Sequence, residues 1–219
     1  MHFSISKYEN YLDRIHLSTV DVERQLVASP FIEATEKNED IEKAEIGSMV
    51  IPFYNYILHK GKIPNQETFY KEYQTYNLRE YQWVIHCVGW GLEPYERNLC
   101  LYGRVCGRSY PSFVRDIYFA LLCKERCKDY SVLYNPKLDM EVGVDILFSK
   151  GDNHVGACLY QNSTRGEAEY NRKKEKQKAY ENLRYLKCPL PFSKDIGNFH
   201  LFADEEYESV MHKVRNLLP

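Results

Sequence analysis

The sequence lacks a long apolar run, a signal-like N-terminus and any strong excess of charge. No stretch approaches the roughly 18–20 apolar residues that cross a bilayer, so no membrane contact is expected. The first residues have no basic segment followed by an apolar core, which predicts that there is no signal peptide. The formal net charge of −2 argues against a generic coat for nucleic acid, so any basic surface must be local. We expect a cytoplasmic protein.

Paired-cysteine motifs and the common enzyme signatures are also missing. The seven cysteines are scattered and none forms a CxxC pair, which argues against a zinc ribbon and favours reduced thiols. The sequence contains no P-loop, no GxGxxG after a strand, no HExxH and no GxSxG. These absences argue against P-loop and dinucleotide-binding enzymes, zinc proteases and α/β-hydrolases.

The chain is long enough for two structural parts. Its 219 residues, 44% of them hydrophobic, can form a full core together with a smaller helical domain. Residues 1–108 contain several short helical patterns without alternating strands, which predicts a helical N-terminal domain. Nothing in this part resembles a recognition helix rich in Arg, Asn and Gln, so a structural or partner-binding role is favoured over base reading.

Residues 109–219 have a mixed pattern that predicts an α+β domain. The expected helices cover residues 113–127, 166–185 and 204–217. The expected strands cover residues 131–134, 141–149, 154–161, 188–192 and 199–202, with a hairpin turn at 150–153. Counted to the last helix, the core order is α-β-β-β-α-β-α.

One acidic residue stands inside the apolar strand expected at 141–149. Burying an ionised carboxylate without a partner is costly, so Asp145 must be paired, protonated or lining a cleft. Glu141 and Gly143 lie four and two positions earlier, on the same face of a period-two strand. Two carboxylates beside a residue without a side chain predict a metal site that a phosphate backbone can approach. The alternative is a structural ion pair, for which Arg115 or Lys137 could be the partner.

The element order and the segment Gly143-Val144-Asp145-Ile146 resemble the PD-(D/E)XK nuclease superfamily, over roughly residues 109–202. The resemblance implies a restriction-endonuclease-like αβββαβ core. In that family the second strand carries a metal-binding aspartate, which Asp145 matches. The third strand carries Glu or Gln, then one residue, then Lys. Gln161 matches the Glu/Gln position.

The family's lysine falls on Ser163 in this sequence. If the register is one residue later, Asn162 and Thr164 take the two positions, and the lysine is still missing. A cation displaced to a neighbouring element could replace it, and Arg165 is the nearest candidate. A catalytically inactive site is the other possibility.

The resemblance implies a set of site residues and a cofactor. Mg²⁺ or Mn²⁺ would activate water and neutralise charge on the phosphate, held by one or two carboxylates. The implied catalytic residues are Asp145, Gln161 and Arg165, and the implied metal ligands are Asp145 and Glu141. Supporting positions are Arg115, Asp116 and Asn162.

The helix expected after the third strand has a basic cluster, Arg172-Lys173-Lys174, where a phosphate backbone would pass. The alternative is a solvated helix face with local ion pairs, such as Glu175 with Lys178. Both interpretations remain open on the sequence alone.

Three functions follow from these features. The first is a metal-dependent DNA endonuclease of restriction, mobile-element or phage-defence type. The second is a degenerate nuclease fold that binds nucleic acid or acts as a subunit of a larger assembly. The third is a protein-interaction module that docks through its helical half. DNA is the expected partner, and a protein partner or a homo-oligomer is the alternative.

Overall fold

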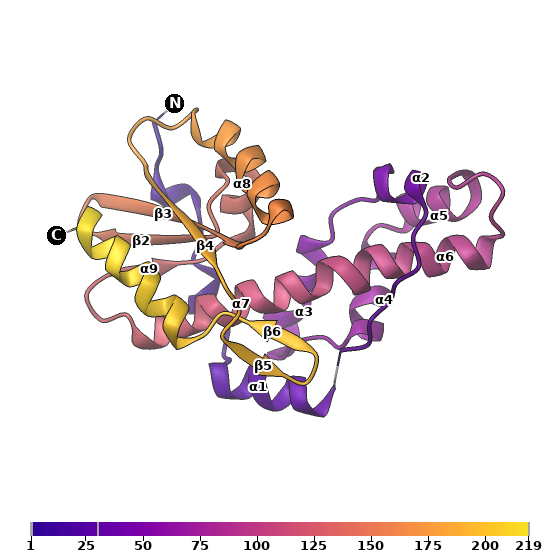
Figure 1. Cartoon of the computed structure of the whole chain (residues 1–219), viewed down its shortest axis with the longest axis horizontal. Helices are drawn as coiled ribbons and strands as arrows, with labels where there is room; N and C mark the ends of the chain where they lie inside the picture. The colour runs from indigo at the N-terminus through magenta and orange to yellow at the C-terminus, as the bar shows by residue number, and fades with distance from the viewer. Residues whose placement is uncertain (1, 30, 219) are drawn as a thin grey trace. The chain divides into compact units, whose positions relative to one another are not determined.

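The computed structural model describes residues 2–29 and 31–218, apart from the side chains of Arg165 and Glu169 (Figure 1). It is a mixed α+β structure that divides into two compact units. Unit 1 contains Met1–Thr19, Asp116–Asp195 and His200–Pro219, and unit 2 contains Val20–Arg115 and Ile196–Phe199. Among the described residues, no helix is both long and apolar enough to span a membrane.

The two units differ from the expected division after residue 108. The first 19 residues belong to unit 1, together with most of the C-terminal half. The border between residues 115 and 116 falls inside helix α7 (Tyr110–Arg126). A helix that continues across the border has no composition change at that point, so sequence patterns cannot mark it.

Unit 2 is helical, as predicted for this part of the chain. Its elements are α1 (Thr19–Ala28), α2 (Glu39–Lys43), α3 (Val50–Lys60), α4 (Gln66–Tyr76), α5 (Leu78–Cys87), α6 (Pro94–Tyr102) and the π-helix η3 (Gly103–Ser109). The side chains of Phe53, Phe69 and Tyr110 are almost fully buried and contact one another, with ring centroids 5.5–6.0 Å apart. These aromatic contacts between α3, α4 and α7 form part of the core of this unit.

Unit 1 contains the strands. After the short helical turns η1 (Ile5–Lys7) and η2 (Tyr11–Asp13), its elements are α7, β1 (Ser131–Leu133), η4 (Leu138–Val142), β2 (Ile146–Lys150), β3 (Asn153–Gln161), α8 (Thr164–Gln177), β4 (Arg184–Leu190), β5 (Lys194–Ile196), β6 (Phe199–Leu201) and α9 (Asp204–Leu217). From α7 to β4 the order is helix, three strands, helix and strand, as predicted, except that the unpredicted helical turn η4 lies between the first two strands. Strands β5 and β6 form a separate two-stranded sheet, whose residues from Ile196 to Phe199 are assigned to unit 2.

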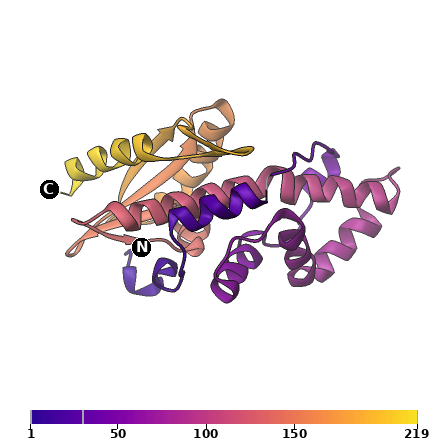
Figure 2. The same ribbon diagram turned by 90° about the horizontal axis from the view of Figure 1, so that it is seen from below.

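The four-stranded sheet has the order β1-β2-β3-β4. β1 and β2 are antiparallel, as are β2 and β3, whereas β3 and β4 are parallel. Helices α8 (orange) and α9 (yellow) pack against these strands (Figure 1), and the second view shows α9 lying along them (Figure 2). β3 is buried from Val155 to Tyr160, as expected for a central strand covered on both faces.

Two predicted elements differ most from the structure in their bounds. The strand expected at 141–149 begins only at Ile146, because residues 138–142 form the helical turn η4. The helix expected to reach residue 185 ends at Gln177. Beyond it, Tyr180 and Leu183 pack with Phe3 and Tyr8 in a hydrophobic cluster. This tertiary packing favours an extended chain over a longer helix.

Candidate functional site

Asp145 is buried and both of its carboxylate oxygens have partners. Its side chain is 6% exposed. Oδ2 accepts a hydrogen bond from the backbone N–H of Leu159 on β3, at 2.8 Å. Oδ1 accepts one from the ammonium of Lys173 on α8, at 2.6 Å. The partner of the buried carboxylate is therefore Lys173, rather than Arg115 or Lys137.

Lys173 joins Asp145 to a second carboxylate. Its Nζ lies 2.7 Å from Oδ1 of Asp139, in the first turn of η4. Burial alone lowers the pKa of Lys173, but the two carboxylates outweigh burial and raise this pKa above its ordinary value. Burial raises the pKa of Asp145, and Lys173 opposes that change. We call Asp139, Asp145 and Lys173 the Asp–Lys–Asp cluster.

The turn before Asp145 holds α8 in place. Gly143 has φ of 74°, in the left-handed region, and ends η4. Its carbonyl oxygen accepts hydrogen bonds from Nε2 of Gln177, at 2.9 Å, and from the thiol of Cys158, at 3.0 Å. A Cβ on Gly143 would lie 2.8 Å from the carbonyl oxygen of Lys173. The absence of a side chain therefore allows the α8 backbone to pack close enough for Lys173 to contact Asp145.

The sequence contains a signal for the buried lysine that the charge pattern obscured. The buried and half-buried residues of α8 include Gly166, Tyr170, Lys173 and Gln177. Their spacing of four, three and four residues is that of a helix face packed on a core. Lys173 is the charged residue in this stripe, and a charge at such a position requires a partner of opposite sign.

The prediction that Glu141 shares a strand face with Asp145 is wrong. Glu141 lies in η4, where its Oε2 accepts a hydrogen bond from the hydroxyl of Tyr8, at 3.1 Å. The left-handed Gly143 separates the helical turn from β2, so the period-two alternation does not extend back to residue 141. The second carboxylate of the cluster is Asp139, which also lies in η4.

Gln161 and Asp145 are on opposite faces of the sheet. Cys158 faces α8, because its sulfur accepts a hydrogen bond from Gln177, at 2.8 Å. Since side chains alternate along a strand, Gln161 faces away from α8, whereas Asp145 contacts α8 through Lys173. Gln161 and Asn162 are both exposed. The Asp145 carboxylate is instead hydrogen-bonded to Leu159 and Lys173.

The remaining predicted residues are distributed over two helices. The Arg165 side chain lies outside the described residues. Arg172 and Lys174 are exposed on α8, whereas Lys173 between them is 18% exposed and faces the cluster. Arg115 and Asp116 are half-buried on α7, on either side of the border between the units. Of the predicted site residues, the structure therefore brings Asp145 and Lys173 together, and Asp139 joins them as a third member of the cluster.

Ser163, at the position where the predicted motif would have lysine, is the N-cap of α8. Its Oγ accepts a hydrogen bond from the N–H of Gly166, at 3.1 Å. We expect Ser163→Ala to lower the free energy of unfolding by about 0.5–2 kcal/mol in urea denaturation. Ser163→Asp should have nearly the wild-type free energy of unfolding, because aspartate also caps helices. Equal losses in both variants would contradict a capping role.

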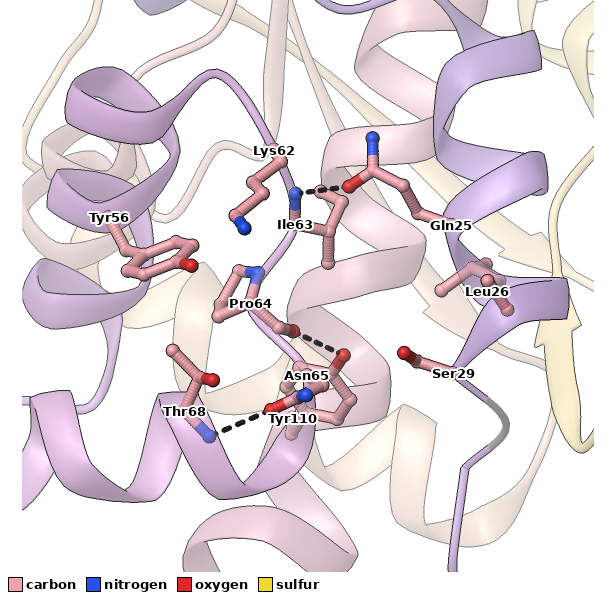
Figure 3. A pocket seen from close by; sticks show the side chains of 11 residues that line it. Gln25, Leu26, Ser29, Tyr56, Lys62, Ile63, Pro64, Asn65, Thr68 and Tyr110 are labelled. Atoms are coloured by element: carbon pink, nitrogen blue, oxygen red, sulfur yellow. Dashed lines mark hydrogen bonds between the residues drawn. The ribbon is translucent and has the colours of Figure 1, made fainter.

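A separate pocket of about 170 Å³ lies within unit 2 (Figure 3). Hydrogen bonds fix its walls: Ile63 N–H to Gln25 Oε1, at 2.8 Å, and the Tyr110 hydroxyl to the Pro64 carbonyl, at 2.6 Å. The 11 lining residues in Figure 3 include no Asp, Glu, His or Cys. We therefore assign the candidate chemistry to the Asp–Lys–Asp cluster in unit 1 rather than to this pocket.

The cluster is a pair of carboxylates rather than a complete metal cage. Within residues 2–29 and 31–218, no group of three or more His, Cys, Asp or Glu side chains is arranged to hold a metal ion. Comparison with known protein families, curated proteins and solved structures gave no match. The structure defines a mixed α+β protein with a partly buried acid–lysine cluster, formed where η4, the start of β2, β3 and α8 meet.

Proposed function

We propose that this chain is a metal-dependent endonuclease that hydrolyses phosphodiester bonds in DNA, with the Asp–Lys–Asp cluster as its site. The observation that carries the proposal is that the carboxylates of Asp139 and Asp145 converge on one positive charge, the Lys173 ammonium. The order of α7, the first three strands, α8 and β4 supports a restriction-endonuclease-like core. Such an enzyme would serve restriction, a mobile element or phage defence.

The cluster fits a divalent cation by the chemistry of its donors. The ammonium of Lys173 is a stand-in cation, since it contacts one oxygen of each carboxylate at 2.6 and 2.7 Å. Mg²⁺ needs only one or two carboxylates, because waters and substrate phosphate complete its shell. Asp139 and Asp145 would hold the ion. When bound, the ion would supply an activated water and neutralise charge on the phosphate.

Lys173 supplies the cation that the related family has two residues after its Glu or Gln. An ammonium beside the reacting phosphate stabilises negative charge that develops in the transition state. Lys173 lies on α8. Ser163, at the position where the family has its lysine, is the N-cap of the same helix. On the same helix, Arg172 and Lys174 are exposed and would contact the DNA backbone.

The test is DNA cleavage by the purified chain with Mg²⁺ or Mn²⁺. We expect the wild type to nick or linearise plasmid DNA. Asp145→Asn should cleave at least about 100-fold more slowly, which is the typical effect of removing one electrostatic group that stabilises the transition state. The control is Asp152→Asn, because Asp152 is exposed in the hairpin turn between β2 and β3. Equal cleavage by all three proteins would remove the site assignment.

A second candidate function is DNA binding without cleavage. It is favoured by the pairing of Lys173 with both carboxylates, because the ammonium already occupies the position between them without a metal. Salt-sensitive DNA binding by the wild type, with no cleavage in either metal, would select this function and reject the nuclease.

A further inference from the structure

The charge balance of the cluster depends on where one ammonium lies. The Asp145 side chain is 6% exposed, Lys173 is 18% exposed and Asp139 is 42% exposed. A carboxylate as buried as Asp145 needs a cation beside it, because an unpaired buried charge is strongly unfavourable. When no metal is bound, Lys173 is that cation.

A metal ion and the ammonium would need the same oxygen atoms. Oδ2 of Asp145 already accepts the N–H of Leu159, so Oδ1 is the oxygen that faces the incoming cation. Oδ1 of Asp139 is likewise the atom nearest to Lys173. Two cations at these two oxygens would repel each other at a distance of a few ångströms, where little water separates them.

We infer that Lys173 is a built-in competitor of the divalent cation, so that metal binding and the Lys173–Asp145 ion pair exclude each other. This inference rests on the proposed function and concerns how its site is regulated. Metal binding would displace the Lys173 ammonium from both carboxylates, which makes it available to a substrate phosphate. The same lysine would thus weaken metal affinity and assist catalysis.

The prediction is that removing the lysine strengthens metal binding. In calorimetric titrations with Mn²⁺ and without DNA, we expect Lys173→Met to bind at least about tenfold more tightly than the wild type. Lys174→Met is the matched control, because Lys174 is the exposed neighbour on the same helix, and it should bind as the wild type does. Asp145→Asn should lose the binding.

A second measurement uses the wild-type protein, in case Lys173→Met does not fold. Lysine acetylation is followed at each site by peptide mass spectrometry, with and without Mn²⁺. We expect Mn²⁺ to raise the labelling rate of Lys173 by about tenfold or more, and to leave that of Lys174 unchanged.

The outcomes separate this inference from the proposed function. Equal Mn²⁺ affinity in the wild type and Lys173→Met, or unchanged Lys173 labelling, would overturn the competition and leave the nuclease proposal intact. If neither the wild type nor Lys173→Met binds Mn²⁺, the metal site itself is rejected, and both proposals fail with it.

Discussion

Gly143→Ala should lower the free energy of unfolding by about 2–5 kcal/mol, the sum of left-handed backbone strain and overpacking. The residue has φ of 74°. The new Cβ would lie 2.8 Å from the backbone carbonyl oxygen of Lys173 and 3.1 Å from its Cβ. Because the nearest atom belongs to a helix backbone, a side-chain rotation cannot relieve the contact.

The matched control is Gly151→Ala in the turn between β2 and β3. Gly151 has φ of 60°, but an added Cβ would meet nothing within 4 Å. We expect this variant to lose only the cost of backbone strain, about 1–2 kcal/mol. Urea denaturation of both variants separates strain from close packing. Losses of the same size would contradict a role for Gly143 in positioning α8.

Lys173→Met should lower the free energy of unfolding by about 3–5 kcal/mol, measured by urea denaturation without divalent cations. The substitution leaves the Asp145 carboxylate buried without its cation. We expect a second substitution, Asp145→Asn, to recover much of this loss. The amide oxygen of asparagine can still accept the Leu159 N–H without leaving a buried charge.

Lys174→Met is the control for this pair, with an expected change within about 0.5 kcal/mol because Lys174 is exposed. The two single variants and the double variant form a double-mutant cycle, and one result would contradict the expected coupling. A double variant as unstable as the sum of the two single losses would mean that Lys173 and Asp145 act independently, which the 2.6 Å ion pair does not permit.

Local patterns in the sequence were sufficient for most of the secondary structure of unit 1. The last helix, Asp204–Leu217, has the predicted bounds, and β3 begins one residue before the predicted strand. Both elements combine an apolar period with clear end signals, which depend only on near neighbours in the chain. The prediction for residues 141–149 failed because a single glycine in the left-handed region interrupts the alternation.

The partners of Asp145 depend on residues far away in the chain. Lys173 lies 28 positions later and Leu159 lies 14 positions later. The resemblance to a nuclease family instead predicted Gln161, at the end of β3, and Arg165, at the start of α8, as site residues. The inward-facing stripe of α8 predicts the site better, since it contains Lys173, a charged residue that cannot be buried without a partner.

By itself, the sequence determined the absence of a long apolar helix, the order of the main helices and strands from α7 to β4, and the presence of a carboxylate that needs a partner. Only the tertiary structure decided which cation meets Asp145, that Asp139 rather than Glu141 is the second acid, and where the chain divides into units. The physical reason is that periodicity and capping act between near neighbours, whereas ion pairing depends on how α8 packs across Gly143 onto β2 and β3.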